Sequence, residues 1–353
     1  MADEHPFARF VRILARGPGR SRDLTREEAR EAMSMIAQDQ VLPEQVGAFL
    51  MLLRFKQETG EEMAGFVDAL RAGSAIGPAG GSTGEASADL AAIDLDWPSY
   101  SSGKSRGLPW FLLSALLLAE NGVRLFMHGY NSNPAHSSIT TQAVVKHLGL
   151  PVCTSLGQAV EQLDRDNFAY APLQTVSQTL QKLITLRPVL GLRSPANSLA
   201  RMINPLRANA IMTGVFHPGY LQIHRDAAQR LDQQVLGVFK GGGGEAERNP
   251  GKSCLLHILQ GGEMVEEVWP PTGNILPVSD RPTAPDLNDL TALWRGELSV
   301  EPGAAAIYAD AEARVVGTAA LALRLIGRAS TPDAAQGLAT RYWNNRDRSR
   351  FAA

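Results

Sequence analysis

A run of four glycines, Gly241 to Gly244, directly follows an apolar stretch of the chain. Glycines after a strand let backbone N–H groups come close to a phosphate, so the run predicts an anion site, with a flexible turn as the alternative. The Lys252-Ser253 pair further along does not stand at the G-x-x-x-x-G-K-[ST] spacing from any glycine of the run, so the run is not a P-loop. Glu245 and Glu247 are too few carboxylates to predict a Mg²⁺ site on their own. The basic neighbours of the run are Lys240, Arg248 and Lys252.

A second polar group follows the apolar stretch 123–127. It consists of His128, Gly129, Tyr130 and Asn131. In a doubly wound sheet, ligands bind beyond the carboxyl ends of the strands, so this group is a candidate binding site. A single histidine is more often structural than catalytic, and we assign no catalytic residue here. The seven histidines show no zinc spacing.

Basic residues gather in the middle of the chain. Residues 97–225 contain eleven bases and four acids, a balance of +7, and the net charge of −2 therefore leaves −9 on the rest. If folding brings these bases to one face, an anionic ligand or polymer is favoured; if they scatter, they only keep the protein in solution. The candidate contacts to such an anionic partner are Lys104, Arg106, Arg187, Arg193, Arg201, Lys240, Arg248 and Lys252.

The first part of the chain, residues 1–72, reads as a small all-helical domain. Thr25-x-x-Glu28 and Thr59-x-x-Glu62 are capping boxes that each precede an apolar helical stripe. Pro43 can open the helix between them, and residues 7–14 carry a further stripe at helical spacing. Four short helices are therefore expected.

The rest of the chain, residues 90–353, alternates strand-like and helix-like segments. This alternation predicts an α/β domain with a mainly parallel sheet covered by helices. Residues 73–89, rich in Gly, Ser and Ala, are expected to be a flexible linker, and helices from about 173–205 to pack on the N-terminal bundle. The predicted strands are 91–95, 123–127, 168–171, 211–216 and 235–239, with an edge hairpin of 255–259 and 264–269.

Length and composition agree with two globular domains. The chain has 353 residues, of which 44% are apolar and 20% charged. Two cysteines, Cys153 and Cys254, exclude a disulfide framework. The longest apolar run, 108–119, is too short to cross a bilayer, and no segment resembles a signal peptide. We therefore expect a cytoplasmic protein with no membrane partner.

The segment 190–205 carries a family resemblance. In spacing it is similar to LG-x-R-T-x-x-N-x-x-x-P-x-x-NP of the anthranilate phosphoribosyltransferase family, which has the class III nucleoside phosphorylase/phosphoribosyltransferase fold. The residues kept are Arg193, Asn197, Asn204 and Pro205. Arg187 matches the arginine that faces anthranilate, His128-Gly129 matches the family's KHG with Met127 in place of the Lys, and residues 214–216 match its GVF. The resemblance covers nearly the whole chain and implies a helical bundle joined to an α/β domain.

Two functional loops of that family are altered. The pyrophosphate-binding GTGGD is replaced within residues 94–106, DLDWPSYSSGKSR, where proline and bulky aromatics cannot build the same backbone cradle. The metal-binding HG-x-DG-L-DE loop is replaced by residues 240–247, KGGGGEAE, and only Glu247 keeps a member of the acidic pair. Phosphoribosyl pyrophosphate would lack the family's means of charge neutralisation.

This combination resembles a divergent branch of the family, the YbiB-type proteins. The resemblance implies sequence-nonspecific binding of DNA or another nucleic acid, single-stranded DNA or RNA being favoured, no biosynthetic activity and no cofactor. It also implies a homodimer formed through the helical domain, where the stripes 7–14 and 46–53 lie. Tyr100 and Tyr130 would be placed to stack on bases.

Two alternatives stay open. One is a glycosyl or phosphoribosyl transferase, using Mg²⁺, that acts on an unknown substrate through a remodelled cleft; the other is a plain dimeric scaffold. The cleft residues are Tyr100, His128, Gly129, Tyr130, Asn131, Asn197, Gly241, Gly242 and Glu247.

Overall fold

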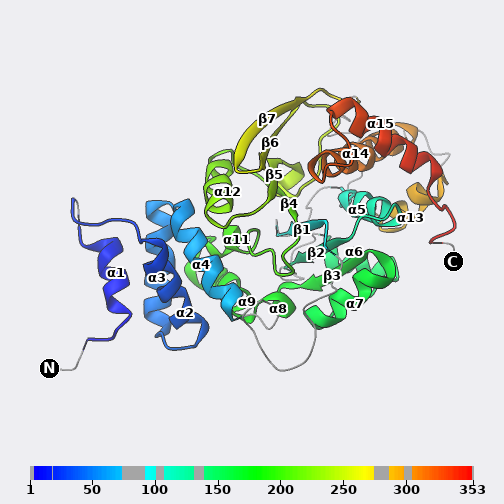
Figure 1. The fold of residues 1–353 in the computed structure, drawn as a ribbon. Coiled ribbons are helices and arrows are strands. Elements are labelled where there is room, and N and C mark those ends of the chain that lie inside the picture. The colour runs from blue at the N-terminus through cyan, green and yellow to red at the C-terminus, as the bar shows by residue number, and fades with distance from the viewer. Residues whose placement is uncertain are drawn as a thin grey trace. The chain divides into compact units, whose positions relative to one another are not determined.

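The computed structural model describes residues 4–17, 19–73, 92–100, 107–130, 139–273, 286–297 and 304–351. The chain divides into two compact units, whose elements are labelled in Figure 1. The helical unit comprises Met1–Ala91, Leu173–Pro205 and Gly219–Gln233. The sheet unit comprises Ala92–Pro172, Leu206–Pro218 and Gln234–Ala353. The predicted linker, residues 73–89, lies outside the described residues except for Gly73.

The helical unit contains the four N-terminal helices expected from the sequence. The helical segment expected from about 173–205 is divided into short pieces. Gly191 takes a left-handed conformation (φ 73°) that ends one of these helices after a single turn. The helices of the unit are α1 (Ala8–Ala15), α2 (Arg26–Ala37), α3 (Pro43–Lys56), α4 (Gly60–Ala72), α8 (Leu173–Val176), α9 (Gln178–Thr185), α10 (Arg187–Leu190), α11 (Ala196–Leu199) and α12 (Gly219–Arg230).

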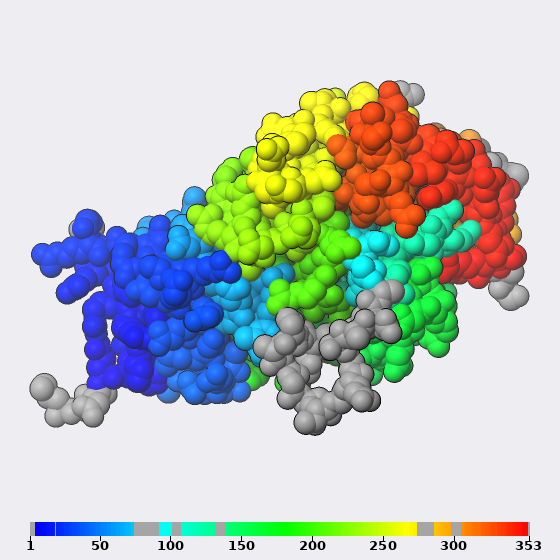
Figure 2. Space-filling model, in the orientation of Figure 1, coloured from blue at the N-terminus to red at the C-terminus, as the bar shows by residue number. Residues whose placement is uncertain are grey.

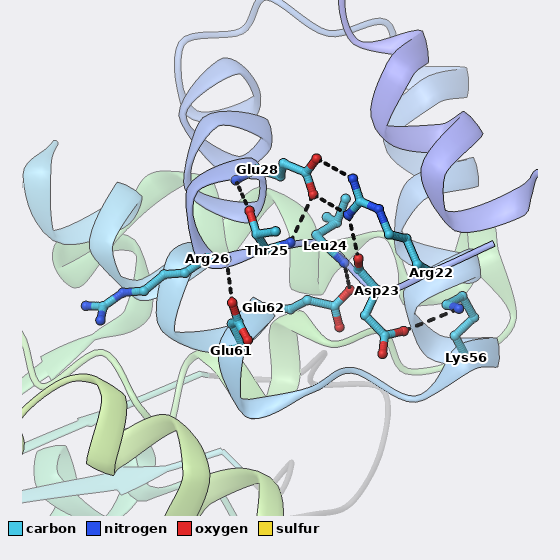
Figure 3. Close-up of polar contacts among 9 residues, drawn as sticks. All are labelled: Arg22, Asp23, Leu24, Thr25, Arg26, Glu28, Lys56, Glu61 and Glu62. Carbon is cyan, nitrogen blue, oxygen red and sulfur yellow. Dashed lines mark hydrogen bonds and ion pairs between the residues drawn. The ribbon is translucent and has the colours of Figure 1, made fainter. Parts of the chain in front are cut away.

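Both predicted capping boxes are confirmed, and Figure 3 shows the one formed by Thr25 and Glu28. At the start of α2, the Thr25 hydroxyl accepts from the Glu28 amide at 3.2 Å and the Glu28 carboxylate accepts from the Thr25 amide at 3.0 Å. At the start of α4, the Glu62 carboxylate accepts from the amides of Thr59 at 2.8 Å and Leu24 at 3.0 Å. Glu62 thus joins the two helix starts. Burial raises the pKa of Glu62 above its usual value.

The segment 219–233, which the sequence places in the α/β domain, groups instead with the helical unit. Helix α12 approaches α4 so closely that a Cβ on Gly60 would lie 2.4 Å from the Asp226 Cβ. The Arg26 guanidinium donates to the Arg230 carbonyl at 2.6 Å. Gly60 allows this close approach because it has no side chain. Hydrophobic periodicity in the sequence does not indicate that α12 packs on α4.

His224 on α12 makes the stability of the protein sensitive to acid. Its side chain is buried, and burial together with the nearby Arg201 charge lowers the pKa of His224 to about 3. Below the usual histidine pKa of about 6.5, His224 is protonated in the unfolded chain but stays neutral in the folded protein. Stability is therefore lost as the pH falls from about 6.5 to about 3, by roughly 1.4 kcal/mol per pH unit.

We expect His224→Gln to remove this part of the acid sensitivity. The free energy of unfolding, measured by urea titration at pH 7, 6 and 5, should then fall less steeply in the variant than in the wild type, by about 2 kcal/mol in total between pH 7 and pH 5. Parallel curves for the two proteins would show that His224 is protonated equally in both states.

The sheet unit is built on one seven-stranded sheet with the order β3-β2-β1-β4-β5-β6-β7. The first five strands in this order are parallel, and β6 and β7 form an antiparallel edge hairpin. This confirms the predicted mainly parallel α/β fold. The strands are β1 (Leu95–Ser99), β2 (Leu125–Gly129), β3 (Phe168–Pro172), β4 (Ala210–Val215), β5 (Val235–Lys240), β6 (Cys254–Gln260) and β7 (Glu263–Trp269).

The first strand lies further along the chain than the predicted 91–95. Its sequence includes Asp96 and Pro98, which speak against a central strand. The structure accommodates Pro98 because β1 pairs with β4 only at Leu95 and Asp96, so the missing N–H costs no ladder bond on that side. On its other side β1 pairs with β2 over its whole length, from Leu95 opposite Leu125 to Ser99 opposite Gly129.

Helices complete the sheet unit. Helix α5 is buried on all sides from Phe111 to Ala119, which explains the long apolar run as core rather than membrane span. In the space-filling view, α14 and α15 (orange to red) form part of the outer surface of the unit (Figure 2). Among the described residues no helix is long and apolar enough to cross a bilayer. The helices are α5 (Phe111–Glu120), α6 (Thr141–His147), α7 (Leu156–Asp166), α13 (Asn288–Arg295), α14 (Ala304–Leu325) and α15 (Pro332–Asn345).

Candidate functional site

The carboxyl ends of the central parallel strands carry most of the predicted polar residues of the sheet unit. Strand β1 ends at Ser99 and is followed by Tyr100, while its neighbour β2 ends in His128 and Gly129. The chain adds β2 and β3 on one side of β1 and then β4 and β5 on its other side, so the strand order reverses between β1 and β4 (Figure 1). Such a switch point is the usual place of a ligand site in open α/β sheets.

Tyr100, His128 and Asp96 form a buried hydrogen-bonded chain at this switch point. The Tyr100 hydroxyl lies 2.5 Å from His128 Nδ1, and His128 Nε2 lies 3.2 Å from an Asp96 carboxylate oxygen. An ionised carboxylate only accepts, so this geometry places the proton of a neutral His128 on Nε2 and leaves Nδ1 to accept from Tyr100. Phe126 stacks on the imidazole with ring centroids 5.5 Å apart. The hydrogen bonds of His128 tie β2 to β1 and to the residue that follows β1.

Asp96 is a member of this chain that the sequence analysis missed. The signal was an acidic residue inside an otherwise apolar strand, where a charge is costly unless it is paired. Tyr100 is only 2% exposed, so its predicted stacking on nucleic-acid bases is wrong. Tyr130 is half-buried just after β2, and Asn131 lies outside the described residues.

The glycine run folds as a tight turn after β5 and does not form an open cradle. Its residues Gly242–Gly244 make a short 3₁₀ turn, η1, in which the Gly242 amide donates to the Glu247 carbonyl at 2.9 Å and the Gly244 amide to the Gly241 carbonyl at 3.3 Å. A Cβ on Gly241 would lie 1.7 Å from the Glu245 carbonyl oxygen. Glycine is therefore required for close packing inside the turn, and the turn interpretation is favoured over the phosphate site.

Glu247, the acid that the resemblance assigns to a metal site, is fully buried and already bonded within the protein. One carboxylate oxygen accepts from the Phe111 amide at the start of α5 at 3.1 Å, and the other faces the Arg314 guanidinium at 3.4 Å. Within the residues that the structure describes, no group of three or more His, Cys, Asp or Glu side chains is arranged to hold a metal. The residues around Glu247 do not fit Mg²⁺.

Two of the predicted nucleic-acid contacts are wrong because their side chains are buried. Arg248 is 1% exposed: its guanidinium donates to the Pro270 carbonyl and to Gln336 at 3.2 Å. Burial lowers its pKa. Arg201 is 9% exposed and lies near His224. A charged side chain looks like a surface residue in a sequence, and nothing local distinguishes these two.

Four predicted contacts are exposed, two in each unit. Arg187 opens α10 and Arg193 follows it in the helical unit, whereas Lys240 ends β5 and Lys252 precedes β6 in the sheet unit. Asn197 is half-buried in α11. Lys104 and Arg106 lie outside the described residues.

Comparison with known proteins supports the family named by the motifs. Residues 9–74 match the family model described as glycosyl transferase family, helical bundle domain. The chain is 31% identical over 251 residues to the anthranilate phosphoribosyltransferase of Brevibacillus brevis, covering 70% of this chain and 69% of that protein. It is 24% identical over 256 residues to the uncharacterized protein YbiB of Escherichia coli, covering 72% and 76%.

The fold agrees as well. The crystal structure of anthranilate phosphoribosyltransferase from Thermus thermophilus superposes with a TM-score of 0.72 at 20% identity, covering 96% of this chain and 94% of that one. Together with the relative at 31% identity, this places the helical bundle and the mixed sheet within one family. The chain belongs to the anthranilate phosphoribosyltransferase-like family of glycosyl transferases.

Proposed function

We propose that this protein binds nucleic acid through its phosphates, without reading base sequence, and does not perform the biosynthetic transfer of its enzymatic relatives. The observation that carries the proposal is an acid-free stretch of the chain. No Asp or Glu occurs between Asp166 and Asp226, and within that stretch Arg187 and Arg193 are exposed. Exposed arginines without acids nearby in the chain attract phosphate and supply affinity that is independent of sequence.

Arg187 is the clearest contact of the set. Among the described residues it has no ion pair, whereas Lys182 in the same stretch is held by Asp39 at 2.8 Å. In the sheet unit, Lys240 and Lys252 add exposed positive charge. Binding by side chains of this kind is electrostatic, so DNA and RNA are both suitable partners.

The test is fluorescence anisotropy with a labelled single-stranded oligonucleotide. Each lost phosphate contact is worth roughly 1 kcal/mol, so Arg187→Ala with Arg193→Ala should weaken binding roughly 30-fold and equally for different sequences. The matched control replaces Arg30 and Arg341, exposed arginines outside the acid-free stretch, and should retain near wild-type affinity. An equal loss of affinity in both double variants would mean that binding depends only on net charge, which would contradict a defined binding surface.

A transferase acting on an unknown substrate is the second candidate, because the relatives include enzymes and because the Tyr100–His128–Asp96 chain lies at the switch point. The bonding of Glu247 to Arg314 and Phe111 speaks against a family-type metal site.

We also propose a homodimer formed through the helical unit, in a cytoplasmic protein that keeps both cysteines reduced. The stripe expected to form the interface is core instead: Phe10 and Leu14 are buried, and Phe7 packs edge-on against Phe49 with centroids 5.2 Å apart. Large apolar side chains are exposed elsewhere in the unit. Phe55 is 87% exposed and Val189 is 80% exposed.

We expect Phe55→Glu with Val189→Glu to yield a folded monomer, since a charge at a buried contact is costly while an exposed position tolerates it. Light scattering measures the mass, and circular dichroism checks the fold. Phe10→Glu is the matched control, and we expect it to unfold the bundle. A dimer mass unchanged in the double variant would place the interface elsewhere.

A further inference from the structure

A buried cluster of charges joins three elements of the sheet unit. Glu247 follows the turn η1, Arg314 and Asp310 lie on α14, and the Phe111 amide begins α5. Arg314 binds Asp310 with two nitrogens, at 2.6 and 3.2 Å, and reaches Glu247 at 3.4 Å with a third. The Glu247 side chain is 0% exposed, and those of Arg314 and Asp310 are 10% exposed.

Most of the negative charge of the cluster is offset without any added ion. Two carboxylates face one guanidinium, and the N-terminus of α5 adds partial positive charge at Glu247. Burial alone would lower the pKa of Arg314, but Glu247 and Asp310 outweigh it and hold that pKa above its usual value. Arg314 is therefore a permanent charge here.

The same geometry excludes a divalent cation. Mg²⁺ needs about six oxygen ligands in octahedral arrangement, whereas each oxygen of Glu247 already has a donor. A second cation would also be repelled by the guanidinium 3.4 Å from the carboxylate it needs. We propose that Arg314 is a built-in cation in the place where the family resemblance implies a metal, so that this unit works without one.

The inference is independent of nucleic-acid binding, because it concerns only what neutralises Glu247 and Asp310. Removing the guanidinium leaves two buried carboxylates without a counter-charge, which is strongly destabilising. A divalent cation added from solution could then replace the lost charge. Arg314→Lys keeps a positive charge and is the matched conservative variant.

The experiment compares thermal unfolding of the full chain with and without Mn²⁺, together with Mn²⁺ binding followed by electron paramagnetic resonance. We expect no Mn²⁺ effect on the wild type or on Arg314→Lys. Arg314→Met should lose roughly 5 °C or more in Tm and regain part of it with Mn²⁺. Arg314→Met with Glu247→Gln and Asp310→Asn should not respond to Mn²⁺.

Two results would overturn the proposal. One is a Mn²⁺ site in the wild type that Glu247→Gln abolishes, since Glu247 would then be a metal ligand despite Arg314. The other is an Arg314→Met protein as stable as the wild type, since the guanidinium would then not be needed to neutralise Glu247 and Asp310. If Arg314→Met fails to fold, the wild-type and Glu247→Gln measurements still decide the question.

Discussion

Binding of a single-stranded oligonucleotide is expected to weaken steeply as the salt concentration rises. Each contacted phosphate lowers the slope of log K against log[salt] by about 0.7, because a bound cation releases condensed counterions. If Arg187, Arg193, Lys240 and Lys252 all make contacts, raising the salt from about 50 to about 200 mM should reduce affinity about 50-fold.

Double variants in each unit measure how much that unit contributes to the salt dependence of binding. Replacing Arg187 and Arg193 by Ala should flatten it by about 1.4, and replacing Lys240 and Lys252 should do the same if the sheet unit takes part. Arg30→Ala with Arg341→Ala is the control and should leave the slope unchanged. Tight binding with a slope near zero in the wild type would contradict phosphate contact as the source of affinity.

No phosphoribosyl transfer to anthranilate is expected from this protein. With phosphoribosyl pyrophosphate, Mg²⁺ and anthranilate, product formation should equal that of the protein-free reaction. The reason is structural: Glu247 is bonded to Phe111 and Arg314, and the turn after β5 uses its amides internally. A divalent cation, which would neutralise part of the pyrophosphate charge, then finds both carboxylate oxygens of Glu247 already bonded.

The assay follows phosphoribosyl-anthranilate by the loss of anthranilate fluorescence. The Brevibacillus brevis anthranilate phosphoribosyltransferase, a relative at 31% identity, serves as the positive control. A turnover on the order of 1 s⁻¹ from this protein would restore the transferase as its function.

Much of the fold could be predicted because its signals are local. The boxes at Thr25 and Thr59 mark helix starts within four residues, and apolar runs mark β2, β4 and β5. The hairpin of β6 and β7 follows from two apolar stretches around Gly261 and Gly262. Strand β1 was predicted too early in the chain because Asp96 and Pro98 are unusual in a central strand. The structure tolerates Pro98 because β1 pairs with β4 only at Leu95 and Asp96.

The site was harder to predict because its partners are distant in the chain. Glu247 and Arg314 are 67 residues apart, and no sequence pattern links them. The signal that existed was Asp310 and Arg314, four residues apart on a mainly apolar helix. Arg248 looked like a surface cation because its acceptors, Gln336 and the Pro270 carbonyl, are brought together only by the tertiary fold.

Calorimetric titration of one nuclease-treated preparation tests the central claim most directly. The protein is titrated in parallel with a single-stranded oligonucleotide and with phosphoribosyl pyrophosphate plus Mg²⁺, at the same low salt concentration. We predict saturable binding of the oligonucleotide, weakened by Arg187→Ala with Arg193→Ala, and no saturable binding of phosphoribosyl pyrophosphate. Saturable, Mg²⁺-dependent binding of phosphoribosyl pyrophosphate, with no binding of the oligonucleotide, would contradict this proposal. It would indicate that the protein is a phosphoribosyltransferase like its enzymatic relatives.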